Sequence, residues 1–274
     1  EPISKIGRRQ WRSNSLSETL AKRGHDVIRW RSSFSHQKKE QLSSQSSSIR
    51  VNNFSQQFIY SPSYKHHIGF KRFRHHIELG NEFLRLAKQS ELPDVINVCN
   101  VPLELCNACI SFGEKNDIPV IIDIRDLWPD SYLNFLPKKI QFLKKPLLRL
   151  LNLFSYKVRR SYSKATAITA ITKPILDWGL KKAPNRNNSL DAVFPMAYPK
   201  TNPIKKINKS ELRIKYGVRE NSLIACYSGN IGYQTDFDTF LLAAKLIESN
   251  NLPIHFIIAG SGPRENEIKE KSSK

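Results

Sequence analysis

The feature that most constrains the fold is an apolar run that breaks abruptly into charge. Residues 120–124 are mostly apolar and β-branched, which is typical of a strand buried on both faces of a parallel sheet. Arg125 and Asp126 follow at once, and Pro129 ends the extended segment because proline cannot continue a ladder. Open α/β sheets bind ligands at the carboxyl ends of their strands. Arg125 and Asp126 are therefore candidate catalytic residues, and a surface turn held by a salt bridge is the alternative.

The pattern around this run predicts the α/β class, because strands and helices alternate in steps of 10–15 residues. In the first half we expect helices at 77–90 and 102–112, a turn and then a strand within 92–98, and strands at 120–124 and 165–171. A lysine-rich stretch at 198–209 indicates a linker, after which a strand–helix–strand unit follows at 223–228, 237–249 and 254–259. We place the domains at 1–196 and 197–274, with the second domain truncated.

The amino-terminal part indicates an anion site. A helix is expected from Ser13 or Ser15 to about Arg23, with Gly24 as its stop. Arg9 and Arg12 lie in the basic loop at the start of this helix, where the dipole and unpaired N–H groups favour anions. A solvated basic surface is the equal alternative, and His25 to Trp30 follows as a strand.

Two further stretches of this part are expected to be loops. Residues 41–48 are rich in Ser and Gln, which is typical of a flexible loop. Residues 64–76 are basic and aromatic, and Lys71, Arg72 and Arg74 are expected to face a phosphate or carboxylate. The paired histidines there have no carboxylate at ligand spacing, so a metal site is disfavoured.

The net charge of +20 is concentrated in two places. Residues 1–75 hold 15 Lys and Arg against 4 acids, and residues 137–164 hold 9 Lys and Arg and no acid. The rest of the chain is neutral in sum, which favours anionic partners at defined surfaces.

Residues 137–164 interleave basic and apolar side chains and resemble a helix lying on an anionic membrane. An ordinary solvated helix flank is the alternative. No apolar run of the sequence approaches the ~18 residues that a bilayer span needs. The side chains expected to face the membrane are Lys138, Lys139, Lys144, Lys145 and Arg149.

Cys106 and Cys109 have the C-x-x-C spacing, but no second pair accompanies them. Residues three apart share a helix face, so two buried thiols are the preferred interpretation over a metal or redox site.

Two glycine-rich segments follow strands in the second half, and we expect both to be turns. Glycine lets backbone N–H groups approach a phosphate closely, although neither segment matches a dinucleotide or P-loop motif. As a pair at successive strand ends they suggest a ligand with a diphosphate. The candidate donor-binding residues are Gly229, Asn230, Gly232, Gly260 and Gly262.

These stretches together resemble family 4 of the retaining glycosyltransferases, close to the bacterial enzymes of capsule and lipopolysaccharide synthesis. The most specific match is Asp-Ile-Arg-Asp-Leu-Trp-Pro-Asp-Ser at 123–131. Further matches, in chain order, are Arg-Gly-His-Asp-Val at 23–27, Phe-Ser-His-Gln-Lys-Lys at 34–39, Pro-Asp-Val-Ile at 93–96, Tyr-Ser-Gly-Asn-Ile-Gly at 227–232 and Ala-Gly-Ser-Gly-Pro at 259–263.

The resemblance implies a GT-B-like fold of two Rossmann-like domains, the second truncated here. The first would bind a lipid-linked or glycan acceptor through Arg9, Arg12 and Arg72, and the second would bind a nucleotide-sugar. The implied transfer retains the anomeric configuration and needs no metal or cofactor. An anionic membrane surface is the third expected partner, which implies a cytoplasmic protein peripheral on the inner face of the plasma membrane. Many relatives carry a histidine-containing loop where this chain has Arg125.

Two alternatives stay open. The charge allows a basic nucleic-acid-binding protein, although no nucleic-acid-binding motif is present and no nucleic acid is expected as a partner. The second alternative is a fragment at both ends or a non-catalytic remnant, because no strand precedes the first expected helix and the glutamates that grip the donor in relatives lie further on. We therefore expect no transferase activity from this chain alone, and measurable turnover with a nucleotide-sugar would contradict that expectation.

Overall fold

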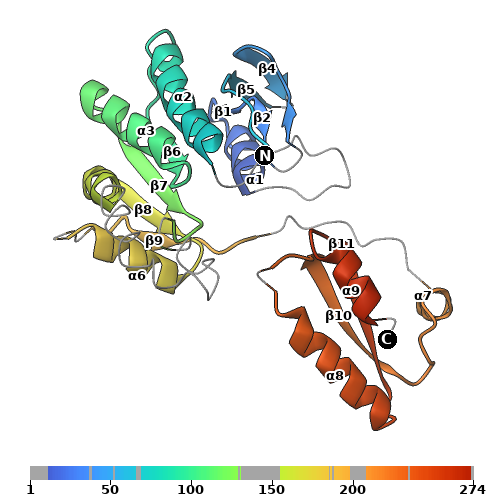
Figure 1. Cartoon of the computed structure of the whole chain (residues 1–274). Helices are drawn as coiled ribbons and strands as arrows, with labels where there is room; N and C mark the ends of the chain where they lie inside the picture. The colour runs from blue at the N-terminus through green and yellow to red at the C-terminus, as the bar shows by residue number, and fades with distance from the viewer. Residues whose placement is uncertain are drawn as a thin grey trace. The chain divides into compact units, whose positions relative to one another are not determined.

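The computed structural model describes residues 12–36, 39–51, 53–65, 69–128, 130, 155–184, 186, 188–197, 208–233 and 235–272 (Figure 1). The chain divides into two compact units, residues 1–199 and 200–274. The boundary predicted from the sequence lies between residues 196 and 197.

A four-stranded parallel sheet forms the centre of the first unit. Its strands are β6 (Ile96–Cys99), β7 (Val120–Ile124), β8 (Ala167–Ala170) and β9 (Ala192–Val193), in that order. The helix α3 (Leu103–Asn116) connects β6 to β7, and α6 (Lys173–Lys182) connects β8 to β9. Residues 155–164, which precede β8, are also helical. The α/β class predicted from the alternation is therefore confirmed.

The main hydrophobic core lies on one face of this sheet. Alternate side chains of β7 point to opposite faces, so only every second residue of β7 can face this core. A Cβ built on Gly113 of α3 would collide with Val120, and one built on Gly179 of α6 would collide with Ile124. Val120, Ile122 and Ile124, all buried, therefore face the helices. Ile121 and Asp123 point to the other face.

A second, three-stranded sheet in the same unit has the order β1-β5-β4. Its strands are β1 (Ile28–Ser32), β5 (Phe54–Ile59) and β4 (Ser47–Val51), with β1 and β5 parallel and β4 antiparallel. A short hairpin of β2 (Phe34–Ser35) and β3 (Glu40–Gln41) follows β1. The expectation of a flexible loop over 41–48 is wrong at both ends, because Gln41 and Ser47 belong to strands.

Two helices complete this part of the unit. The helix α1 (Arg12–Lys22) ends before Gly24, whose positive φ of 90° matches the predicted stop. The helix α2 (Phe70–Ala87) lies beside α3 (Figure 1). It begins seven residues before the predicted start at 77, so Lys71, Arg72 and Arg74 are in its first turns and not in a loop.

The second unit is built around a strand–helix–strand motif. Its elements are α7 (Lys209–Lys215), β10 (Leu223–Asn230), α8 (Phe237–Ser249), β11 (Ile254–Ser261) and α9 (Glu265–Ser272). The two strands are parallel and pair from Leu223 with Ile254 to Asn230 with Ser261. Buried Ile231, Phe237 and Ile268 form its small core. The part of the chain that the structure describes contains no helix with the length and apolar character of a membrane span.

Candidate functional site

The polar side chains predicted around residue 125 gather at the carboxyl edge of the four-stranded sheet. Asn100 follows β6, Arg125 and Asp126 follow β7, and Pro195 follows β9 by two residues. Strands that run parallel end at the same edge, which is where open α/β sheets bind ligands. Arg12, the first residue of α1, reaches this edge and donates from a terminal guanidinium nitrogen to the carbonyl of Pro195 over 3.0 Å.

Asp123 is the centre of the site, and sequence reasoning did not single it out. Its side chain is only 3% exposed, on the face of β7 away from the helices. Oδ2 accepts hydrogen bonds from Nε of Arg12 at 3.0 Å and from Nε of Arg125 at 2.7 Å. Oδ1 accepts from Thr169, the residue paired with Asp123 on β8, at 3.0 Å. A carboxylate is tolerated there because these donors satisfy it.

The two arginines keep the carboxyl group of Asp123 ionised. Burial alone raises the pKa of Asp123, but the hydrogen bonds from Arg12 and Arg125 outweigh it and hold the pKa below its usual value. The aspartate is therefore ionised and meets two guanidinium groups, whose side chains are 17% and 23% exposed. The single carboxylate thus holds both cations at the carboxyl edge of the sheet.

The segment that carries Arg125 and Asp126 is fixed at both ends. The buried side chain of Asn100 accepts from the backbone N–H of Arg125 at 3.2 Å and donates to the carbonyl of Asp126 at 2.8 Å. Farther along, Asp130 accepts from Trp178 and Lys182 of α6, both at 2.8 Å. The carboxylate of Asp126 belongs to an exposed residue next to Arg125, so it can meet a ligand at this edge.

The predicted acceptor-binding arginines are distributed over several places. Arg12 lies in the cluster around Asp123, and Arg72 lies in the first turn of α2. Arg9 lies outside the described residues, as do the five side chains predicted to face a membrane, which are Lys138, Lys139, Lys144, Lys145 and Arg149.

The predicted glycine turns of the second unit are wrong in part. Gly229 and Asn230 belong to β10, and Gly260 belongs to β11, paired with Gly229. A Cβ on Gly260 would collide with the carbonyl oxygen of Gly229. Close approach of the two strands thus explains Gly260 without a ligand.

The other two glycines that were predicted to bind a donor lie just beyond the strand ends. A Cβ on Gly262 would collide with the carbonyl oxygen of Ile231, and one on Gly232 would lie 2.6 Å from Nδ2 of Asn230. All five candidate residues are nevertheless at the carboxyl edge of this small parallel sheet.

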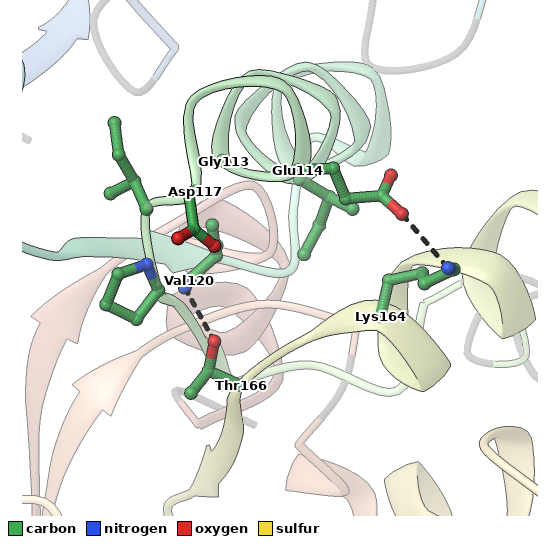
Figure 2. Close-up of a pocket in the computed structure, with 9 residues that line it drawn as sticks. Gly113, Glu114, Asp117, Val120, Lys164 and Thr166 are labelled. Carbon is green, nitrogen blue, oxygen red and sulfur yellow. Dashed lines mark hydrogen bonds and ion pairs between the residues drawn. The ribbon is translucent and has the colours of Figure 1, made fainter.

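A separate cavity of about 270 Å³ lies at the end of the four-stranded sheet opposite to the Asp123 cluster. Figure 2 shows Glu114 of α3 facing Lys164 across it, with an ion pair of 3.2 Å, and the N–H of Val120 donating to Oγ1 of Thr166 at 3.1 Å. Val120 begins β7 and Thr166 precedes β8, so this cavity is at the amino ends of the strands. Because ligands of such sheets bind at the carboxyl ends, we assign the site to the cluster around Asp123.

Cys106 and Cys109 are both buried free thiols in α3, as the spacing predicted. Burial raises the pKa of both thiols, that of Cys106 also through its neighbours Cys109 and Cys99. No group of three metal-ligating side chains occurs within the described ranges.

Comparison with known proteins does not assign the chain to a family. No protein-family model matches it, and no curated protein matches it.

Proposed function

We propose that this chain serves in a retaining glycosyltransferase of the GT-B type, with the first unit binding a phosphate-bearing acceptor and the second a nucleotide-sugar. The observation that carries the proposal is the cluster of Arg12, Asp123 and Arg125 at the carboxyl edge of a parallel sheet. The sequence resemblance, which is most specific at residues 123–131, supports the same assignment.

The cluster suits the binding of an acceptor that carries a phosphate or diphosphate. Preorganised cations stabilise such negative charge most strongly where water is partly excluded. Asp123 holds Arg125 in one orientation, so the side chain of Arg125 loses little conformational entropy when an anionic ligand binds. In the proposed transfer the bond from the anomeric carbon to the diphosphate oxygen breaks, and the acceptor hydroxyl bonds to the same face of that carbon. Asp126 accepts the hydroxyl proton.

The donor would bind at the carboxyl edge of β10 and β11, near Gly232 and Gly262. Arg264 follows this edge, where it pairs with Glu267 at 2.8 Å and with Asp238 at 3.4 Å. Because these carboxylates already pair with the guanidinium group of Arg264, we assign contact with the donor diphosphate to backbone N–H groups. The basic stretch at 137–164 would hold the protein at an anionic membrane that carries the acceptor.

The experiment is a binding titration of the 274-residue chain at fixed ionic strength. The ligands are a soluble short-chain polyprenyl diphosphate sugar and a 20-nucleotide single-stranded DNA. We expect saturable binding of the diphosphate sugar that weakens about tenfold in Arg125→Gln, because a charge-assisted hydrogen bond is lost. A melting curve of the variant checks its fold.

The matched control is Arg85→Gln, which removes an exposed arginine near the end of α2. No binding of the diphosphate sugar, or equal weakening in both variants, overturns the proposal. Binding of the DNA in preference to the sugar favours the nucleic-acid alternative and also overturns it.

A further inference from the structure

A cluster of basic and aromatic side chains lies beyond the ends of β1 and β5. We call it the Tyr64 cluster, and its members come from the β2–β3 hairpin, the segment after β5 and the start of α2. Tyr64 is buried at its centre, with ring centroids 4.7 Å from Phe34 and 5.0 Å from His75. The members are Phe34, His36, Lys39, Tyr64, Arg72 and His75.

Lys39 is held over this cluster by the hairpin. It has a positive φ of 58°, which is uncommon for a residue with a Cβ. Its Nζ lies 4.6 Å from the centre of the Tyr64 ring and 3.4 Å from Nδ1 of His36. Since an ammonium group only donates, Nδ1 of His36 accepts from it, and the same nitrogen lies 2.5 Å from the hydroxyl of Tyr64.

The positive charge of Lys39 has no carboxylate partner in the described part of the chain. Lys39 is partly buried, and burial together with the charge of Arg72 lowers its pKa. Lys39 therefore carries two costs, which are its partial withdrawal from water and the nearby charge of Arg72. An anion beside the ammonium group would relieve both.

The titratable groups described nearby on α2 and α3 do not compensate this charge. His75 and His76 both have lowered pKa values, chiefly because of burial, so they are neutral near pH 7. Glu104 of α3 lies 3.6 Å from His76, and burial raises its pKa. It forms no ion pair with Lys39, and its environment favours the neutral form.

We propose that the Tyr64 cluster is a binding site for a phosphate or diphosphate group, with Lys39 as its principal contact and Arg72 as the second cation. Tyr64 and His36 orient the ammonium group, and the group in turn donates to phosphate oxygens. The site is separate from the Asp123 cluster in its residues, and it lies beyond the carboxyl ends of β1 and β5. That the phosphate belongs to the acceptor of a glycosyl transfer rests on the proposed function.

Inorganic pyrophosphate is the first probe, titrated into the full chain by calorimetry at low ionic strength. We expect Lys39→Gln to weaken binding about tenfold and Lys39→Arg to retain most of it, because the arginine keeps the charge. The control is Lys88→Gln, which removes an exposed lysine directly after α2 and should leave binding unchanged. Circular dichroism spectra establish that the variants fold.

A soluble polyprenyl diphosphate and UDP then distinguish the two sources of the phosphate. Selective weakening of either ligand by Lys39→Gln identifies the source and supports the site. Equal pyrophosphate affinity of wild type and Lys39→Gln overturns the site, even if the diphosphate sugar still binds through Arg125. Conversely, pyrophosphate binding through Lys39 without any binding of the diphosphate sugar overturns the glycosyltransferase proposal and leaves the phosphate site standing.

Discussion

Arg125 donates a hydrogen bond from Nε to Oδ2 of Asp123, two residues earlier in the chain, over 2.7 Å. The two side chains share one face of β7 and its extension, because residues two apart in a strand point the same way. Arg12 reaches the same carboxylate from α1. A single buried aspartate therefore sets the position of both cations at the carboxyl edge of the sheet.

Asp123→Asn should destabilise the first unit by about 3 kcal/mol, because it leaves two guanidinium groups facing a neutral amide. The arginines are partly exposed, so the cost is at the lower end of the range for broken buried pairs. Urea unfolding measures it. Asp177→Asn, which breaks an exposed pair with Lys173 on α6, is the matched control and should cost less than about 0.5 kcal/mol. Equal costs for the two variants would show that the cluster is not structurally important.

The same pair has a pH signature. The folded pKa of Asp123 lies below the ordinary 3.8, so the unfolded chain binds this proton first as the pH falls. The stability contributed by the ionised group is then complete well above pH 4 and is lost as the pH falls below about 3.8. The stability difference between wild type and Asp123→Asn should therefore shrink when unfolding is measured at pH 3. A difference that stays constant from pH 7 to pH 3 contradicts the assigned charge.

The site shows what sequence reasoning reaches and what it misses. The run at 120–124 predicts β7, and the abrupt change to charge predicts functional residues after it. Asp123 was missed because it lies inside the apolar run, although an acid in a buried strand is itself a signal of a partner. Its partner Arg12 is 111 residues away in sequence, so no local pattern connects them.

The boundaries of helices and strands were predicted correctly where a local signal sets them and were missed where tertiary contacts set them. The predicted helix at 237–249 agrees with α8, because Asp236 caps it locally by accepting from the N–H of Thr239. The start of α2 was missed because its first turns carry histidines and arginines that pack at the Tyr64 cluster and not in an apolar stripe. The β10 and β11 ends were taken for turns because glycine has two uses, and only the paired strands show that close approach applies here.

A buried histidine of α2, His76, should make the stability of the first unit decrease as the pH falls. Burial, and then the charge of Arg72, lower the pKa of His76 from 6.5 to about 3. Between these values the unfolded chain holds a proton that the folded chain does not, so stability decreases as the pH falls, by up to about 1.4 kcal/mol per pH unit. Glu104 opposes this slope, because its folded pKa is raised. Urea unfolding from pH 7 to pH 4 should show a shallower slope in His76→Gln.

The exposed His25, in the turn after α1, provides the control for this slope. His25→Gln removes a histidine outside the packed helices. This variant should keep the pH slope of the wild type, so that its slope still differs from that of His76→Gln. If His76→Gln has the same pH dependence as wild type, His76 does not titrate as its surroundings imply.

Gly260→Ala should destabilise the second unit by about 2 kcal/mol, because the new methyl group collides with the backbone carbonyl of Gly229. Gly232→Ala is the matched comparison, since its methyl group meets only the amide nitrogen of Asn230, which can rotate away. Hydrogen exchange of the β10 amides distinguishes the two. Faster exchange in Gly260→Ala than in Gly232→Ala is expected, and the reverse order would contradict the packing explanation of Gly260.

The basic stretch gives a prediction that rests on charge alone. Each lysine or arginine near an anionic membrane contributes about 1 kcal/mol of binding free energy. Replacing five of them with glutamine should therefore lower the affinity for vesicles containing phosphatidylserine by at least a hundredfold. The substitutions are made together at Lys138, Lys139, Lys144, Lys145 and Arg149.

The control for this experiment is a second fivefold variant of equal net charge. It replaces exposed lysines elsewhere on the chain, which are Lys22, Lys88, Lys115, Lys181 and Lys245. Vesicle sedimentation at two salt concentrations measures both variants, because membrane attraction through charge weakens as salt rises. If the stretch forms a membrane-binding surface, the first variant loses far more affinity than the second. Equal losses would mean that the vesicles sense only the net charge of +20, and the membrane-facing assignment would then fail.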